Sequence, residues 1–89
     1  MDYDEFKTDW RNREQIDYLF GKKLKFLQYS TEVRDHEHCE FCFERISNIQ
    51  DSVREGYCTV DTKYKYWICP QCYNDLKDIF KWEIISFKS

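Results

Sequence analysis

The chain has 89 residues, of which 42% are hydrophobic and 19% aromatic, with only two glycines and one proline. This composition is typical of one folded domain with an aromatic core, spanning 1–89, and argues against a disordered segment. The net charge is −3 with both signs mixed along the chain, which argues against a phosphate backbone as the main partner. A domain this short has a small core, so a stabilising metal ion is common at this size.

The amino-terminal residues are acidic and lack the apolar run of a signal peptide, and no segment is apolar over the length that spans a bilayer. We therefore expect a cytoplasmic protein with no membrane association. In that compartment its five cysteines are reduced and available to a metal ion. The odd number of cysteines also argues against a complete set of disulfides.

Two helices are predicted before the first strand. The first is a short helix within residues 1–11, with a frayed terminus as the alternative, and it would dock the aromatic face formed by Tyr3, Phe6 and Trp10. The second is predicted over residues 13–20, where Asn12 and Gln15 have the spacing of a capping box. Gly21 is placed to end that helix.

Residues 22–33 are rich in strand-forming residues and predict a β-strand, with clean alternation from Leu27 to Val33 and a bulge within 24–27. After the first cysteine pair, residues 43–46 predict a short strand and residues 47–55 a loop.

A β-hairpin is predicted from two runs of strand-forming residues, 56–60 and 64–68, joined by the three residues 61–63. Pro70 suits the first position of a helix, which the apolar spacing extends over 70–82. The tail at 84–87 predicts a short strand or a cover for the core.

The strongest motif is a pair of short sequences, Cys39-Glu40-Phe41-Cys42 and Cys69-Pro70-Gln71-Cys72, separated by residues 43–68. Each pair places two sulfurs within reach of one ion, and two such pairs supply the four thiolates of a closed tetrahedral zinc site. The sequence therefore predicts one structural Zn²⁺ held by Cys39, Cys42, Cys69 and Cys72.

The order of knuckle, loop, hairpin and helix over residues 38–82 resembles the treble-clef group of zinc fingers. This resemblance implies that the first cysteine pair forms the knuckle and that the second comes from the hairpin end and the first helical turn. Zinc ribbons usually place glycine after each second cysteine, whereas Phe43 and Tyr73 stand here, which favours the treble clef. The chain also resembles small bacterial proteins with two Cys-x-x-Cys motifs, a likeness that implies no activity.

The expected fold class is therefore a small zinc-stabilised α+β domain, treble-clef-like, with an additional amino-terminal helix and strand. Independently of the resemblance, Cys72 in the first turn of a helix would meet free backbone N–H groups. These groups and the helix dipole favour the thiolate form of Cys72.

The fifth cysteine and two histidines are left outside the predicted site. With a three-residue hairpin loop, Cys58 would face Tyr66 and point away from the face of Cys69, whereas a four-residue loop would reverse this. His36 and His38 could replace a ligand, hydrogen-bond a thiolate, or form a separate site with Asp35. We favour two solvated or capping histidines.

Two enzymatic alternatives explain fewer of these residues. His38 and Glu40 together with Cys69-x-x-Cys72 match the ligands and proton shuttle of a zinc deaminase, but leave Cys39 and Cys42 without a role. The Cys69–Cys72 pair at a helix amino terminus could instead be a redox dithiol. A site closed by four thiolates has no open position for water, so we expect no catalysis and no small-molecule substrate.

The function expected is that of a non-catalytic zinc-binding module that binds another protein, for example as an immunity or inhibitor protein. The alternative is a nucleic-acid-binding zinc finger. That alternative would use a small basic and aromatic patch formed by Lys22, Lys23, Lys25, Phe26 and Tyr29.

Overall fold

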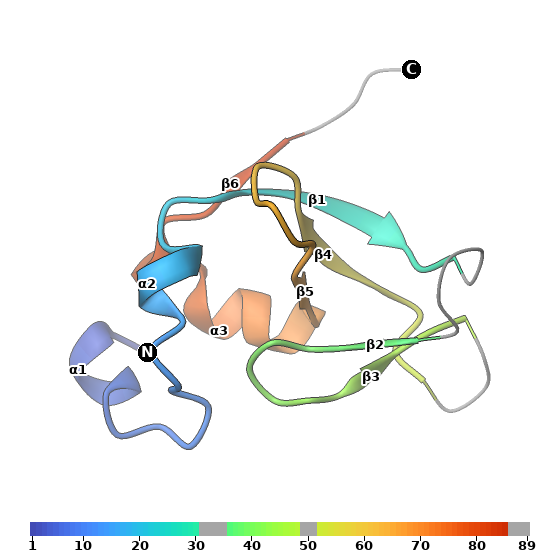
Figure 1. Ribbon diagram of the computed structural model, residues 1–89. Coiled ribbons are helices and arrows are strands. Elements are labelled where there is room, and N and C mark those ends of the chain that lie inside the picture. Colours follow the sequence, from blue (N-terminus) through green and yellow to red (C-terminus); the bar gives the residue numbers. More distant parts are fainter. Residues whose placement is uncertain (31–35, 49–51, 86–89) are drawn as a thin grey trace.

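The computed structural model describes residues 1–30, 36–48 and 52–85, and Figure 1 shows their arrangement. Along the described residues, two short helices are followed by a run of strands, a longer helix and a last short strand, as expected for an α+β domain. The elements are α1 (Tyr3–Phe6), α2 (Ile16–Leu19), β1 (Lys23–Gln28), β2 (Glu37–His38), β3 (Arg45–Ile46), β4 (Glu55–Thr59), β5 (Trp67–Ile68), α3 (Pro70–Phe80) and β6 (Glu83–Ile84). The predicted α+β class is confirmed.

A four-stranded sheet in the order β5-β4-β1-β6 forms the upper layer in Figure 1. Strand β1 is antiparallel to β4, and its ladder runs without interruption from Leu24 opposite Thr59 to Gln28 opposite Glu55. The bulge predicted within 24–27 is therefore wrong, because both strands keep a regular pleat. The predicted extension of this strand toward Val33 enters residues 31–35, which lie outside the described residues.

The hairpin of β4 and β5 is confirmed, and of the two pairings left open for Cys58 it has the one expected with a four-residue loop, although the loop between the strands is longer. Cys58 lies opposite Trp67 rather than Tyr66. Thr59 sets this register: its N–H donates to the Tyr66 carbonyl at 3.1 Å and its hydroxyl accepts from the Tyr66 N–H at 3.0 Å. The Thr59 hydroxyl also shares a hydrogen bond of 2.6 Å with Thr62, which closes the longer loop.

Helix α3 lies below the sheet in Figure 1, between the amino-terminal helices and the β2–β3 hairpin. Pro70 is in its first turn, as predicted. The helix ends two residues earlier than predicted, because Lys81 adopts a left-handed conformation with φ of 55° and its N–H caps the Lys77 carbonyl. The apolar spacing that predicted the helix corresponds to its buried face, formed by Cys72, Leu76, Ile79 and Phe80.

Helix α1 is capped by Asp2, whose carboxylate accepts from the Glu5 N–H at 2.9 Å. Of the three aromatic residues predicted to dock together, only Phe6 is fully buried, whereas Tyr3 and Trp10 are exposed. Phe6 makes edge contacts with Phe41 and Phe80 at centroid distances of 6.1 and 5.6 Å. A single aromatic anchor therefore joins α1 to the core.

Helix α2 is shorter than the predicted 13–20 because Gln15 does not form a capping box. Its buried side-chain amide instead donates to the carbonyls of Arg11 at 2.8 Å and Glu40 at 3.1 Å. Glu14 has a left-handed φ of 64°, which keeps the preceding residues out of the helix. Gly21, which ends this region as predicted, has a φ of 71°.

The tail forms β6, the short strand predicted there, which pairs in parallel with β1. Just before it, the buried Trp82 donates its indole N–H to the Leu19 carbonyl at 2.9 Å, which joins α2 to the end of α3. Residues 86–87 of the predicted tail strand lie outside the described residues. Within the described residues, no helix has the length and apolar character needed to cross a bilayer.

Candidate metal centre

The first cysteine pair lies in the tight turn that joins β2 to β3. The turn is closed by the Cys39 N–H, which donates to the Glu44 carbonyl at 2.9 Å, and by the Phe43 N–H, which donates to the Cys39 carbonyl at 3.0 Å. Phe43 follows Cys42 with a left-handed φ of 63°, the conformation that glycine adopts without strain. The turn of residues 39–44, called the knuckle below, therefore forms without a glycine after its second cysteine.

The second pair lies where β5 runs into α3. Cys69 is the N-cap of the helix, and its sulfur accepts from the Cys72 N–H at 3.5 Å. The two halves are joined by the backbone, because the Glu40 N–H donates to the Trp67 carbonyl at 2.8 Å. The Cys69 N–H also donates to the Cys39 sulfur at 3.3 Å. This hydrogen bond places the Cys39 side chain beside the beginning of α3.

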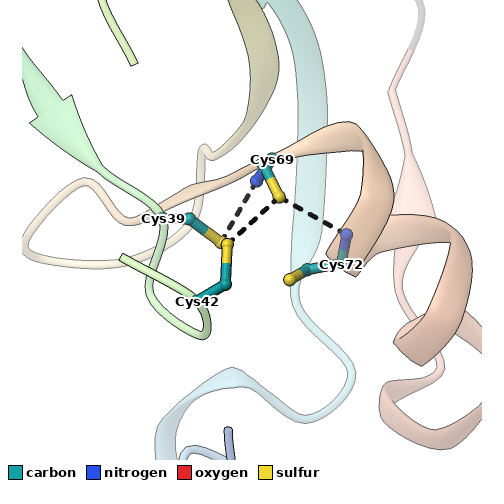
Figure 2. A group of neighbouring side chains, drawn as sticks. All are labelled: Cys39, Cys42, Cys69 and Cys72. Carbon is teal, nitrogen blue, oxygen red and sulfur yellow. Dashed lines mark hydrogen bonds between the residues drawn. The ribbon is translucent and has the colours of Figure 1, made fainter. Parts of the chain in front are cut away.

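Figure 2 shows the result: the sulfurs of Cys39 and Cys42 from the hairpin turn meet those of Cys69 and Cys72 from the beginning of α3. All four sulfurs lie within 4.8 Å of one another. Those of Cys42 and Cys69 are 3.6 Å apart, which is far too long for a disulfide bond and close to the roughly 3.8 Å that separates sulfurs around one tetrahedral zinc. The structure thus places the four predicted cysteines to bind one metal ion.

The electrostatics of the cluster favour a bound cation once the thiols are deprotonated. Hydrogen bonds from the thiols of Cys69 and Cys72 hold the pKa of Cys39 well below its usual range. The same hydrogen bonds to Cys39 raise the pKa of Cys69 and of Cys72. The cluster therefore stabilises one negative charge and resists further ones. Four thiolates can coexist here only around a positive ion.

Arg11, which no sequence motif marks, is a cationic neighbour of this cluster. Its side chain is buried, and its Nη1 donates to the Cys72 sulfur at 3.6 Å and to a carboxylate oxygen of Asp75 at 2.9 Å. Its Nε donates to Asp9 at 2.9 Å. The hydrogen bond to Asp9 is the main reason that the pKa of Arg11 is raised. Arg11 and Cys72 are 61 positions apart, and no spacing rule connects them.

Cys58 lies outside the cluster, as predicted. Its side chain is 2% exposed, and burial raises the pKa of its thiol to about 11. The rings of His36 and His38 meet edge to face with their centroids 4.9 Å apart, and neither belongs to the four-cysteine group. The alternative site with Asp35 cannot be placed, since that residue lies outside the described residues.

Glu40, the proton shuttle of the deaminase alternative, has another partner. Its carboxylate accepts a hydrogen bond of 2.6 Å from the Tyr18 hydroxyl. Burial and this hydrogen bond raise the pKa of Tyr18. In this structure, Glu40 therefore links the knuckle to α2 through both its side chain and the carbonyl that accepts from Gln15.

Comparison of the chain with protein-family models finds no match, and comparisons with curated proteins and with solved structures find none either. What this centre can do therefore follows from its own geometry.

Proposed function

We propose that the protein is a non-catalytic module whose fold depends on one structural Zn²⁺, bound by Cys39, Cys42, Cys69 and Cys72 in a treble-clef-like arrangement. The observation that carries the metal assignment is the convergence of four sulfurs, three of them buried, within 4.8 Å. Four thiolates are a donor set typical of structural zinc, and they leave no coordination position for a reacting water. Zinc bound here contributes directly to the free energy of folding.

We further propose that the module acts by binding another protein. Large aromatic side chains are exposed on its surface, with Trp10 67%, Tyr64 64% and Phe43 55% accessible. Tryptophan and tyrosine are over-represented among residues that contribute most to protein interfaces. The chain has a charge of −3, and four thiolates with one Zn²⁺ make it two units more negative. An acidic domain of this kind suits an immunity or inhibitor protein that covers a basic cleft.

Phe43 is the exposed residue that we propose contacts the partner protein. A non-glycine residue with a φ of 63° carries backbone strain of about 1 kcal/mol or more. Its ring is more than half exposed, so it contributes little to the core in return. Strain at an exposed aromatic residue beside the knuckle is consistent with a role of the ring in contacting a partner.

The nucleic-acid alternative receives less support from the geometry. Phe26 lies on the sheet face opposite Lys23 and Lys25, because side chains alternate along β1. Tyr29 is only 7% exposed and packs against Trp67 at a centroid distance of 5.1 Å. The residues required for that patch therefore do not share one exposed surface.

Photo-cross-linking in the native cell tests the protein-binding proposal. A benzophenone amino acid at position 43 should form a discrete protein adduct, and the Cys72→Ser substitution should abolish it. The same probe at Phe20, which is 53% exposed, is a control of matched exposure. Nuclease-sensitive adducts, with affinity for generic DNA or RNA that falls steeply with salt, would support the alternative instead.

The enzymatic alternatives have their own test. Deamination of a nucleobase by the purified protein, lost in the Glu40→Gln variant, would contradict the non-catalytic assignment. Reduction of a disulfide substrate that depends on Cys69 and Cys72 would contradict it as well.

A further inference from the structure

The metal centre has a buried cationic side chain against one of its sulfurs. The Arg11 side chain is 9% exposed, and its Nη1 lies 3.6 Å from the Cys72 sulfur. Guanidinium groups are rarely buried unless they are paired, and here the pairing is extensive. We propose that Arg11 is a positioning residue of the proposed zinc centre, which hydrogen-bonds the Cys72 sulfur and slows the release of bound zinc. This inference depends on the zinc assignment above.

The orientation of the guanidinium is set by two carboxylates, those of Asp9 and Asp75. Asp9 accepts from Nε at 2.9 Å and from Nη2 at 3.2 Å, as in a two-pronged arginine–carboxylate pair. Asp75 accepts from Nη1 at 2.9 Å. Asp75 and Cys72 are three positions apart on α3 and so lie on the same side of the helix, where one Nη1 group reaches both. With its other donors engaged, Nη1 remains directed at the sulfur.

The contact has a chemical consequence for the metal centre. Zn²⁺ with four thiolates carries a net charge of −2, and burying such a dianion is costly without a nearby cation. A hydrogen bond from Arg11 withdraws electron density from the Cys72 sulfur. That sulfur is then less nucleophilic and less readily removed from zinc by an electrophile or a competing chelator. Lysine has no planar fork and could not contact Asp9, Asp75 and the sulfur in the same geometry.

The same residue joins the amino-terminal segment to the metal centre. The Arg11 N–H donates to Asp9 at 2.8 Å, and the Arg11 carbonyl accepts from the Gln15 amide at 2.8 Å. That amide also donates to the Glu40 carbonyl within the first Cys-x-x-Cys pair. Residues 9–15 are therefore hydrogen-bonded both to the knuckle, through Gln15, and to α3, through Arg11. Metal retention should depend on this segment although it contains no predicted ligand.

Zinc release provides the first test. The zinc-loaded protein is mixed with the chromophoric chelator 4-(2-pyridylazo)resorcinol, and the rate of transfer is measured for wild type, Arg11→Gln and Arg11→Lys. Loss of a group that hydrogen-bonds a metal ligand typically weakens metal binding about 10- to 100-fold. We expect Arg11→Gln to release zinc faster by a factor in that range and Arg11→Lys to fall between it and wild type. The control is Arg45→Gln, an exposed arginine on β3 that bonds Ser52, and it should release zinc at the wild-type rate.

A spectroscopic readout separates this role from general support of the fold. When Co²⁺ replaces zinc, the energy of the thiolate-to-cobalt charge-transfer band reports the electron density on the sulfurs. We expect this band to move to lower energy in Arg11→Gln and to stay in place in Arg45→Gln. If Arg11→Gln does not fold, Arg11→Lys carries both measurements.

The outcomes are distinguishable. Wild-type release rates and an unshifted cobalt band in the Arg11 variants would overturn the role of Arg11 and leave the zinc assignment intact. Failure of the wild-type protein to bind zinc or cobalt would overturn the zinc assignment itself and, with it, this inference.

Discussion

The guanidinium carbon of Arg13 lies 4.1 Å from the centroid of the Phe43 ring, and the Nη1 of the same arginine donates to the Phe41 carbonyl at 3.0 Å. Arg13 therefore holds the knuckle turn on two sides, through the backbone before Cys42 and the aromatic ring after it. Stacking of the Arg13 guanidinium on the ring offsets part of the strain of a phenylalanine with a left-handed backbone.

The backbone strain at Phe43 can be measured with two variants that both remove the ring. Phe43→Ala retains a Cβ atom at a φ of 63°, whereas Phe43→Gly does not. We expect the glycine variant to be more stable than the alanine variant by about 1 kcal/mol. Urea denaturation at a fixed free-zinc concentration measures the difference. Equal stability of the two variants would contradict the left-handed assignment.

Metal content is the most direct prediction. Elemental analysis of the purified protein should find about one zinc ion per chain, and a strong chelator should unfold the domain, because binding free energy at such a site is folding free energy. Circular dichroism before and after chelation measures the loss of structure. A metal-free protein that remains fully folded would contradict the zinc assignment.

Two cysteine-to-serine substitutions distinguish the predicted ligands from the remaining cysteine. Cys72→Ser should unfold or aggregate the domain, because one of four zinc ligands is lost. Cys58→Ser should cost only about 1–3 kcal/mol, the usual penalty for placing a poorly paired hydroxyl in a buried site. Zinc stoichiometry and thermal denaturation report both effects. Equal effects of the two substitutions would make the ligand set wrong.

The buried thiol of Cys58 predicts a specific alkaline response. Burial raises its pKa to about 11 in the folded protein, above the roughly 8.5 of an exposed thiol. Between these values the unfolded thiol has lost its proton and the folded one has not. This residue therefore contributes stability that is complete below pH 8.5 and is lost as the pH rises toward 11.

Cys58→Ala removes this titrating group. Its unfolding free energy should therefore fall less steeply than that of wild type between about pH 9 and 10, by up to about 1.4 kcal/mol over that unit. Denaturant titrations of both proteins at several pH values provide the comparison. Parallel pH profiles would show that Cys58 ionises equally readily in both states.

Gly56 is predicted to tolerate no side chain. A Cβ atom built there would lie 2.9 Å from the Ile68 backbone carbonyl oxygen, which cannot move without disturbing the β4–β5 pairing. We expect Gly56→Ala to destabilise the domain by about 1–3 kcal/mol and to speed amide exchange in that hairpin. Gly21→Ala is the matched control: no atom lies within 4 Å of its Cβ position, so only its φ of 71° is strained. Its effect should be about 1 kcal/mol, without a change in the hairpin.

The sequence predicted those features that depend on neighbours along the chain. The two Cys-x-x-Cys pairs, Pro70 at the beginning of α3 and the apolar face of that helix all follow from short spacings, and the structure contains each of them. Predictions from neighbouring residues were wrong where a side chain hydrogen-bonds a residue far away in the sequence. Gln15 bonds the Glu40 carbonyl 25 positions away instead of capping its own helix, so α2 is only one turn long.

By itself the sequence determined that four thiols are available in two chelating pairs, because that chemistry is carried by residue type and spacing. Only the tertiary structure decided how the pairs meet. The side-chain hydrogen bond at Thr59 sets the register that leads into Cys69, and no alternation of residue types encodes it. Burial of Phe6 against the core brings the amino-terminal segment to α3, which places Arg11 beside Cys72. Contacts of this kind depend on packing across the whole domain, which is why a side chain near the beginning of the chain adjoins a candidate metal site formed by cysteines from two later segments.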